Sequence, residues 1–466
     1  MEPIPSDQAP TGVPSAAAWR TLLILVVLYF LSILDRQLLS LLVLPIQADL
    51  HLSDSQLGAV QGLAFILFYS IMGLTLAYAV DKFSRSWIVF IGVFLWSLAT
   101  IACGLSTSFR SLFVARLGVG FGEAVLGPAA ATLIGALFPR DRLSLANGIY
   151  TAAVGAAGLA AFWLGGNILV YLEGQGGLVA PFFGHLKPWQ GLFFLAGTIG
   201  IPTALLAFLM SDPKTPRNDP AQGSIPLETL GEFARRRGIL WAAQAFAFGC
   251  LTMSAYAVIS WTPTFLGRAF HSPPNQVGMI MGISFGLCGS VSQIFWGWVI
   301  DRLWRKGVTD AHYRVYFYLV PIGIPIAVLA FTIPNLLVSA TLISVTWLTL
   351  LAQGPLSAAT LLFTPPHLRA RVFAGVALVS SLLAIGLTPF LVGVTTDYLF
   401  KDPAKVGLSI ASFITVFGSL GVLILFLARK RLAHAIQEEQ GERIRNGGGR
   451  TEEIMVVPRR LMEREA

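Results

Sequence analysis

Apolar residues along this chain are gathered into long, almost unbroken runs. A membrane-spanning helix needs about 20 consecutive, mostly apolar residues. Twelve runs reach that length, at 19–44, 57–80, 87–105, 109–138, 143–170, 189–211, 239–262, 275–300, 312–332, 336–363, 372–397 and 405–428. The pattern predicts an all-α, polytopic membrane protein with 12 transmembrane helices. An even number of spans places both termini on the same side of the membrane.

The longest connection between runs, 212–238, divides the chain into six runs plus six. It contains four prolines and then three consecutive arginines, Arg235, Arg236 and Arg237. The predicted parts are a disordered N-terminal tail (1–18), an N-terminal six-helix bundle (19–211), a cytoplasmic linker (212–238), a C-terminal six-helix bundle (239–428) and a charged C-terminal cytoplasmic tail (429–466). Two interpretations of the segment 428–443, where the tail starts, remain open: an amphipathic helix on the membrane surface and a plain solvated segment. The segment 1–18 shows no signal-peptide pattern.

The two halves carry similar short motifs at similar spacing. Asp81–Arg85 follows the second run, and Asp301–Arg305 follows the eighth. Gly127-Pro128 lies in the fourth run and Gly354-Pro355 in the tenth. The separation along the chain is nearly the same for both pairs of motifs. A six-helix unit repeated in parallel is typical of transporters that move two halves about a central site.

Composition excludes several other classes of protein. Of the 466 residues, 55% are hydrophobic and only 12% are charged, with a mean hydropathy of +0.71; this is too little charge for a soluble surface. The net charge of +8 does not indicate nucleic-acid binding, because the basic residues lie in short loops and form no continuous stripe. Three widely spaced cysteines, Cys103, Cys250 and Cys288, suggest neither a metal site nor a disulfide framework. No Walker loop occurs, and we expect no cofactor.

The distribution of Lys and Arg orients the chain. If the termini are cytoplasmic, 25 of the 32 Lys and Arg residues lie on the cytoplasmic side, two lie inside the bilayer, and five lie outside: Arg110, Lys187, Arg268, Lys401 and Lys405. Cytoplasmic loops of membrane proteins carry an excess of these residues. We therefore predict a multi-pass protein of the cell membrane with both termini in the cytoplasm.

Four charged residues lie inside the predicted spans: Asp35 and Arg36 in the first, and Arg116 and Glu123 in the fourth. A charge at bilayer depth costs roughly 3 kcal/mol or more and usually marks the path of an ion or a substrate. Arg116 and Glu123 are two helical turns apart and share a helix face. With a rise of about 1.5 Å per residue, Asp35 and Arg36 lie at a depth in the bilayer between the depths of Arg116 and Glu123. Contacts between Asp35 and Arg116 and between Arg36 and Glu123 are therefore both possible.

These charges predict proton coupling and anion binding. Burial disfavours an ionised carboxylate, whereas a nearby arginine favours it, so Asp35 and Glu123 are the candidate proton carriers. Arg36 or Arg116 would bind an anionic head group through paired hydrogen bonds. The alternative is a permanent ion-pair network that only holds the two segments together, and for Arg116 this alternative is equally open. All six histidines fall in loops or tails, which disfavours a histidine relay.

The C-terminal half carries no charge at bilayer depth. The candidates for lining a substrate path are therefore aromatic or neutral polar residues: Phe65, Tyr69, Tyr150, Ser254, Tyr256 and Gln353. One charged half and one apolar half would suit a molecule with an anionic head and an alkyl tail. The alternative for each aromatic residue is simple packing against helices or lipid.

The motifs resemble those of the major facilitator superfamily over about 19–428. Its signature loop, a Gly and then Asp-Arg-x-Gly-Arg-Lys, is matched by Asp81, Lys82 and Arg85, with Ala77 and Ser84 in place of the glycines. The second copy has Gly297, Asp301, Arg302, Arg305 and Lys306. The fourth-segment signature is present from Arg116 to Glu123. Within the superfamily, Asp35-Arg36 and the run Gly120–Ala124 resemble the Spinster group, and the short loops resemble a bacterial member.

This resemblance implies a substrate and a set of gates. Spinster proteins carry lysophospholipids and phosphorylated sphingoid lipids, which implies an amphipathic anionic lipid here. Asp81 would cap segment 11 and Asp301 would cap segment 5 when the cytoplasmic side is closed, because a helix N-terminus favours a negative charge. The other gating candidates are Arg85, Arg302, Arg142 and Arg371. The alternative for each of these loop charges is simple solvation.

The leading hypothesis is a monomeric secondary transporter of a bacterial inner membrane, surrounded by membrane lipids. It would move an anionic lipid by alternating access while exchanging or co-transporting protons. Two alternatives remain: the same fold with a small organic anion or drug as cargo, and a non-transporting lipid receptor or leak. The glycines before Glu123 resemble part of a dinucleotide loop, but close helix packing explains them better. No nucleophile–base pair or metal set lies at bilayer depth, so we expect no enzyme.

Overall fold

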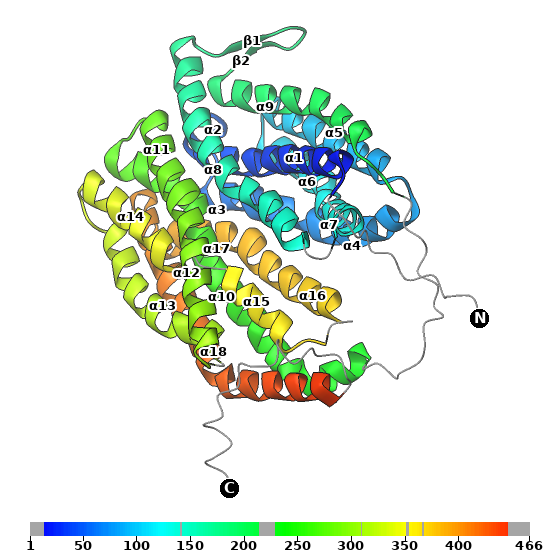
Figure 1. The fold of residues 1–466 in the computed structure, drawn as a ribbon. Coiled ribbons are helices and arrows are strands. Elements are labelled where there is room, and N and C mark those ends of the chain that lie inside the picture. Colours follow the sequence, from blue (N-terminus) through cyan, green and yellow to red (C-terminus); the bar gives the residue numbers. More distant parts are fainter. Residues whose placement is uncertain are drawn as a thin grey trace. The chain divides into compact units, whose positions relative to one another are not determined.

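A computed structural model describes residues 14–139, 142–213, 229–308, 310–350, 354–365 and 368–445. The described chain is almost entirely helical (Figure 1). The elements of the first half are α1 (Ala16–Leu41), α2 (Val43–Leu50), α3 (Asp54–Gly58), the π-helix η1 (Ala59–Leu63), α4 (Ala64–Lys82), α5 (Arg85–Gly104), α6 (Phe109–Glu123), α7 (Leu126–Leu137), α8 (Leu143–Gly174), β1 (Leu178–Ala180), β2 (Gly184–Leu186), α9 (Pro188–Ala204) and the 3-10 helix η2 (Leu205–Leu209).

The second half contains no described strand. Its elements are α10 (Leu230–Phe270), α11 (Pro274–Met281), the π-helix η3 (Gly282–Cys288), α12 (Gly289–Arg305), α13 (Ala311–Ala330), α14 (Leu336–Leu350), α15 (Gly354–Leu362), α16 (Arg369–Ser381), the π-helix η4 (Leu382–Leu387), α17 (Thr388–Val394), the π-helix η5 (Thr395–Phe400), the 3-10 helix η6 (Pro403–Lys405) and α18 (Val406–Arg445).

Each of the twelve predicted spans coincides with a helical segment. Among the described residues, eleven of these segments are long and apolar enough to cross a membrane. The remaining one, predicted over 336–363, is described as α14 and α15 on either side of residues 351–353, which are outside the described part. The prediction of an all-α, polytopic membrane protein is confirmed.

The fourth predicted span, 109–138, is not a single helix. The structure ends α6 at Glu123 and begins α7 at Leu126. Pro128 lies in the first turn of α7 and has no backbone N–H to donate to the residue four positions before it, so it breaks the helical hydrogen-bond ladder there. The break follows directly after Glu123, one of the four charged residues within the predicted spans.

The described residues form two compact units. The first contains residues 1–222 together with 266–286, and the second contains 223–265 together with 287–466. The end of α10, all of α11 and most of η3 therefore belong to the first unit, although they follow the linker in sequence. The sequence boundaries 19–211 and 239–428 stay a prediction.

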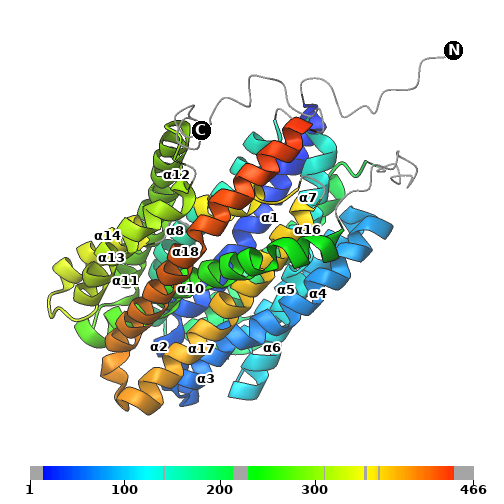
Figure 2. The ribbon, with the colours of Figure 1, turned by 90° about the horizontal axis from the view of Figure 1, so that it is seen from below.

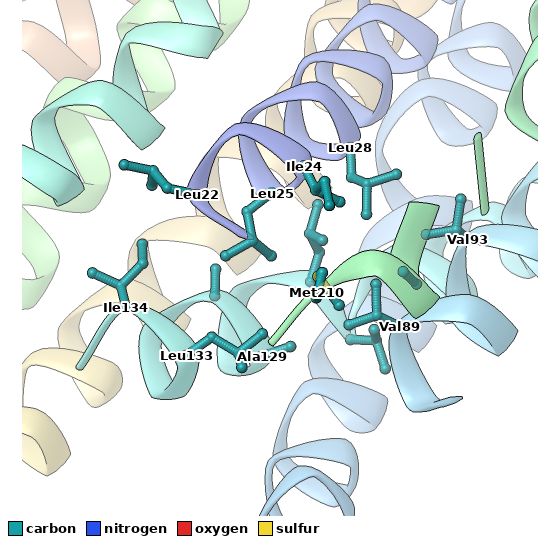
Figure 3. Close-up of a cluster of buried hydrophobic side chains, with 14 of the residues drawn as sticks. Leu22, Ile24, Leu25, Leu28, Val89, Val93, Ala129, Leu133, Ile134 and Met210 are labelled. Carbon is teal, nitrogen blue, oxygen red and sulfur yellow. The ribbon is translucent and has the colours of Figure 1, made fainter. Parts of the chain in front are cut away.

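The first unit is held together by a core of aliphatic side chains from α1, α5 and α7 (Figure 3). Leu25 and Leu28 of α1, Val89 of α5 and Leu133 of α7 are fully buried in this core. In lipid these side chains stabilise the unit through close van der Waals packing, because lipid tails are as apolar as leucine. In the same unit, α5 packs against α6 and α9, and α1 packs against α8. Side-chain hydrogen bonds then link α1 to Thr100 of α5 and to Glu123 of α6.

One pair of π-helical stretches occupies equivalent positions in the two halves. η1 begins at Ala59 in the second predicted span, and η3 begins at Gly282 in the eighth. Their separation along the chain is close to the separation of the paired sequence motifs. A π-helical turn inserts one residue into the α-helical ladder and is often found at functional positions. The internal repeat is thus present in backbone geometry as well as in sequence.

The second unit extends beyond the apolar part of its last span. α18 continues to Arg445, so the described part of 428–443 is helical. One face of this extension is buried through Leu432, Ile436 and Glu439. Glu439 accepts a hydrogen bond at 3.1 Å from Nη1 of Arg237, which belongs to the basic run in the predicted linker. The extension is therefore packed and is not a plain solvated tail.

Candidate functional site

Four helices of the first unit bring the buried charges together. Asp35 and Arg36 lie in α1, Arg116 lies in the middle of α6 and Glu123 at its C-terminal end, and α4 and α5 supply neighbouring side chains. Asp35, Arg116 and Glu123 are all buried. The electrostatic influences on Asp35 include both Glu123 and Arg116. The predicted cluster therefore exists as one group of interacting charges.

Glu123 is held by three hydrogen bonds to one of its two carboxylate oxygens. Arg36 donates to Glu123 Oε2 from Nε at 2.8 Å and from Nη2 at 2.6 Å. Ser32, one turn before Arg36 on α1, donates its hydroxyl to the same oxygen at 2.7 Å. The second oxygen, Oε1, is buried and has no hydrogen-bond partner among the described residues. A proton could therefore occupy Oε1 without displacing any of these donors.

The guanidinium of Arg36 also lies against aromatic rings of α4. Its central carbon is 4.5 Å from the ring centroid of Phe65 and 5.2 Å from that of Tyr69. A cation over an aromatic face is attracted by the ring quadrupole. Gly120 of α6 permits this arrangement, because a side chain there would collide with the backbone carbonyl of Phe65. Close helix packing thus explains this glycine, as predicted.

Asp35 and Arg116 do not form the ion pair that the sequence left open. Asp35 accepts a hydrogen bond from the Thr100 hydroxyl of α5 at 3.1 Å. Arg116 is buried, and its Nε and Nη1 atoms have no hydrogen-bond partner in the described part of the chain. An unpaired buried cation is energetically costly. Of the two possible pairs, the structure forms only Arg36–Glu123.

Access to the cluster differs between its members. The Arg36 side chain keeps 16% of its surface exposed, whereas the Glu123 side chain has none. Asp35 and Arg116 are almost as enclosed as Glu123. Arg36 is therefore the member of the quartet that a dissolved anion would reach first.

The other candidate lining residues are distributed over both units. Tyr150 of α8 stacks on Tyr29 of α1 with ring centroids 4.5 Å apart. Ser254 of α10 is buried, and its hydroxyl donates to the Cys250 carbonyl of its own helix at 3.3 Å. Tyr256 is partly buried in the same helix. Gln353 lies outside the described residues.

Sequence reasoning missed Ser32, Thr100 and Tyr29 as members of the site. Tyr29 is within reach of the charges of Arg36 and Glu123. Tyr29, Ser32 and Arg36 follow one another at helical spacings of three and four residues, so they share a face of α1. This spacing was a usable signal for Tyr29 and Ser32. Thr100 gave no such signal, because only tertiary packing places it beside Asp35. No group of metal-ligating side chains occurs in the described part of the chain.

Comparison with known proteins identifies the family. The profile of the Major Facilitator Superfamily matches residues 25–389. The chain belongs to this superfamily. The fold that the sequence resemblance implied is therefore confirmed, and the chain is related to membrane transporters.

Several relatives are similar to this superfamily member over most of its length. An MFS-type efflux pump of Mycolicibacterium smegmatis is 26% identical over 444 residues, which cover 94% of this chain and 98% of the relative. Protein spinster homolog 3 of Danio rerio is 24% identical, with 91% and 88% covered. A probable L-galactonate transporter of Escherichia coli is 25% identical over 62% of this chain and 64% of its own length.

A solved structure confirms the fold independently. The crystal structure of a bacterial homologue of the human lysosomal transporter Spinster, in an inward-facing and unoccupied conformation, aligns with a TM-score of 0.73. The alignment covers 91% of this chain and 98% of that chain at 23% sequence identity.

The gating candidates of the superfamily motifs have unequal surroundings. Arg85, at the start of α5, donates from Nη1 to Asp212 at 3.2 Å and to the Pro213 carbonyl at 2.9 Å. Its backbone N–H donates to the same aspartate at 2.8 Å. Arg85 thus ties α5 to the segment after η2 within the first unit. Asp81 lies in the last turns of α4, but its side chain is outside the described part.

The remaining gating candidates are exposed. Asp301 and Arg302 lie near the end of α12, and Arg302 lies over the Trp298 ring at 5.6 Å. Arg142 precedes α8, and Arg371 lies in the first turn of α16. The helix-capping roles that the family resemblance implies for Asp81 and Asp301 stay predictions.

Proposed function

We propose that this protein is a secondary active transporter that moves an amphipathic anionic lipid, such as a lysophospholipid or a phosphorylated sphingoid lipid, by alternating access and with proton coupling. The family membership supports transport. The proposed setting is the inner membrane of a bacterium, with a monomer whose termini are both cytoplasmic. The lipid, the proton coupling and this setting go beyond what the family shows.

A single observation carries the proposal: the reachable cation of the cluster, Arg36, is already paired with a fully buried carboxylate, Glu123. The Nε and Nη2 donors of Arg36 cannot serve both Glu123 and an incoming phosphate. Protonation of Glu123 at its unoccupied Oε1 would weaken the existing pair and release these donors. Proton binding and anion binding would then strengthen each other, because linkage between two sites is reciprocal. This favours co-transport of the proton and the anion over exchange.

The surroundings of Arg36 support an amphipathic substrate. Phe65 and Tyr69 lie beside the guanidinium, so a head group bound there would meet an apolar wall. The family members similar to this chain include a protein named for Spinster. Arg116, with two buried donors that have no partner among the described residues, is the second candidate for contact with an anion after a conformational change.

Transport in reconstituted vesicles tests the proposal. Wild-type protein, Asp35→Asn and Glu123→Gln would each be placed in liposomes with a labelled lysophospholipid and an imposed pH gradient. We expect the gradient to accelerate uptake by the wild type and to have no effect on Glu123→Gln. Asp35→Asn tests whether the second carboxylate also carries a proton. Equal, gradient-driven uptake by all three proteins would refute proton coupling at these sites.

The second candidate keeps the fold and changes the cargo to a small organic anion or a drug. The relatives named as a probable L-galactonate transporter and as an efflux pump favour this candidate, and an arginine next to an aromatic ring also suits a carboxylate. A thermal-shift competition separates the two. Stabilisation by sugar acids or dyes, without stabilisation by lysolipids, would replace the lipid proposal.

A non-transporting lipid receptor is the third possibility. A receptor needs to bind lipid but does not need to alternate between two open states. A disulfide engineered between inner loops of the two halves should abolish uptake by a transporter and restore it on reduction. Unchanged lipid binding together with no uptake in either redox state would indicate a receptor.

A further inference from the structure

The connection between α8 and α9 is a β-hairpin with an apolar composition. β1 and β2 pair in antiparallel fashion, with Leu178 opposite Leu186 and Ala180 opposite Gly184. The segment 174–186 contains no Asp, Glu, Lys or Arg, whereas a connection surrounded by water is usually polar. In the predicted orientation this hairpin lies on the outer face of the membrane. Its composition indicates surroundings less polar than water.

The turn of the hairpin carries an aromatic residue at a position that favours glycine. The Phe183 N–H donates to the Ala180 carbonyl at 3.2 Å, and Pro181 and Phe182 are the central residues of this turn. Phe182 has a φ of 67°. A type II turn with proline first requires a positive φ at the next residue, which is usually glycine, and a bulky side chain is strained there. Phe182 is 105% exposed, so no contact with the described part of the protein offsets this strain.

Two contacts with α9 give the direction of the hairpin. At its base, Leu178 packs against Gly191, where an added side chain would collide with the Leu178 side chain. At its tip, the Phe183 ring packs against the Phe194 ring, with centroids 5.4 Å apart. Phe194 lies about one turn beyond Gly191 along α9. The hairpin therefore runs alongside α9 in the direction in which this helix crosses the membrane (Figure 1).

The tip lies beside the spanning part of α9 and not beyond its end. The segment Pro188–Leu209 is long and apolar enough to cross a membrane. It packs along α5, which lies beside α6 in the same unit (Figure 2). Phe194 is roughly 9 Å along the helix from Pro188, and the polar layer on each side of the hydrocarbon core is roughly 5–8 Å thick. With α9 spanning the bilayer, the tip reaches the boundary between head groups and acyl chains.

The exposed rings of the tip continue an apolar surface of the two neighbouring helices. Ile199 and Leu205, further along the α9 segment, are exposed, and exposed apolar side chains of a spanning segment face lipid. Tyr171, in the last turn of α8, is also exposed. Tyrosine is enriched where a spanning helix passes through the membrane surface. Phe182 and Phe183 extend this surface at the same membrane face.

We propose that the β1–β2 hairpin is an interfacial anchor, whose tip residues Phe182 and Phe183 insert among the lipids of the leaflet in which α9 begins. The partner is the lipid surface itself. Phenylalanine is one of the residues that proteins bury at the boundary between head groups and acyl chains. Insertion holds the connection between α8 and α9 at a fixed depth. The inference goes beyond the proposed transport function and depends neither on the substrate nor on protons.

Spin-label accessibility tests the anchor directly. Cys103, Cys250 and Cys288 would be replaced, and a nitroxide attached to Phe182→Cys or, as a matched control in the same connection, to Gln175→Cys. The full chain would be reconstituted into phosphatidylcholine vesicles. Oxygen reaches labels in lipid, and a water-soluble nickel chelate reaches labels in water. We expect the oxygen-to-nickel ratio to be about fivefold higher at position 182 than at position 175. Equal ratios at the two positions would overturn the proposal.

Two substitutions at one position separate the apolar ring from the shape of the turn. A label on Val179→Cys, an exposed position of β1, leaves the tip intact. Phe182→Gly suits the positive φ and should preserve the turn, but it removes the inserted side chain. We expect it to lower the oxygen-to-nickel ratio at position 179 about threefold, whereas Phe182→Leu should leave the ratio unchanged. Equal ratios in these two variants would contradict insertion of the tip.

Two further outcomes would show a different partner. Low accessibility of the label at position 182 to both reagents, rising when the protein is diluted with more lipid, would show that a second copy of the chain covers the tip. Because 174–186 lacks Asp, Glu, Lys and Arg, added phosphatidylglycerol should not change the ratio. A high ratio only with this anionic lipid would overturn apolar insertion. None of these measurements involves a substrate, so failure of the proposed transport function would leave the result for the anchor unaffected.

Discussion

The two compact units each contain a buried polar network at membrane depth, and the networks differ in charge and in completeness. In the first unit, Arg36 and Glu123 are ionisable, and Glu123 Oε1 has no partner among the described residues. In the second unit, Gln244 of α10 donates to the Leu356 carbonyl at 2.7 Å and accepts from the Tyr313 hydroxyl at 2.6 Å. Both atoms of that neutral amide are therefore used.

Because of this difference, the network of the first unit can rearrange during transport, whereas the network of the second unit stabilises one arrangement of its helices. A satisfied neutral network has one low-energy arrangement and stabilises it. A charged network with unpaired donors and acceptors has several arrangements of similar energy, which a proton or an anion can select. We therefore expect substitutions in the first network to affect transport and substitutions in the second to affect stability.

The largest expected effect follows from removing the reachable cation. Arg36→Gln leaves Glu123 buried without its charged partner, and such losses cost about 3 kcal/mol or more. We expect uptake in proteoliposomes to fall about 100-fold. Arg36→Lys keeps the charge but loses the paired donors, so it should retain part of the activity. Uptake at the wild-type rate by folded Arg36→Gln would contradict the expectation that the first network serves transport and the second serves stability.

The next effect concerns the link between pH and binding. Protonation of Glu123 should release Arg36, so wild-type affinity for an anionic lipid should rise as the pH falls. Glu123→Gln imitates the protonated state, and its affinity should be high and independent of pH. We expect a difference of about tenfold at high pH, equivalent to roughly 1.4 kcal/mol of coupling. Tryptophan fluorescence titration measures it, and a variant that keeps the wild-type pH dependence would contradict the linkage.

Arg116→Gln should separate transport from stability. Two of the guanidinium donors of Arg116 are buried and lack a partner in the described part of the chain, and such groups cost free energy in the folded state. Replacement by a neutral amide should leave the unfolding temperature unchanged or raise it, while uptake falls about tenfold as an anion contact is lost. A large drop in the unfolding temperature would instead support the alternative of a permanent structural network.

Tyr313→Phe tests the second network. It removes the hydroxyl that donates to Gln244 and leaves a buried amide oxygen without this donor. The unfolding free energy should fall by about 1 kcal/mol, with uptake per folded molecule unchanged. Thermal unfolding in detergent and uptake in vesicles measure the two quantities. Loss of uptake without loss of stability would place this network in the transport mechanism.

The smallest effect is expected at the aromatic wall. Phe65→Leu keeps an apolar side chain of similar size but removes the ring beneath Arg36. The ring is buried and the guanidinium is partly exposed; a cation–π contact of a partly exposed cation contributes about 0.5–1 kcal/mol, so the apparent affinity for the anion should change only two- to fivefold. Phe162→Leu is a matched control, because that buried ring belongs to α8 and contacts Phe285 of the same unit. Equal effects of the two substitutions would show that only packing changed.

Much of the architecture was predictable from the sequence because the bilayer restricts what a spanning segment can be. The long apolar runs predicted the helices, since backbone groups in lipid must be paired within a helix. The four charged residues were conspicuous because charges are rare at that depth. The spacing of Arg116 and Glu123 predicted that they share one face of a helix, and the structure joins Glu123 to α1 through Ser32 and Arg36.

Only the tertiary structure decided how these charges pair and what surrounds them. Sequence spacing allowed two ion pairs, and packing formed the one between Arg36 and Glu123 while placing Thr100 beside Asp35. The ion pair between Asp54 of α3 and Arg268 of α10 joins positions with no periodic relation in the sequence. Periodicity determines which residues share a face of one helix, whereas contacts between helices depend on how their surfaces fit, and that is fixed only when the whole chain packs.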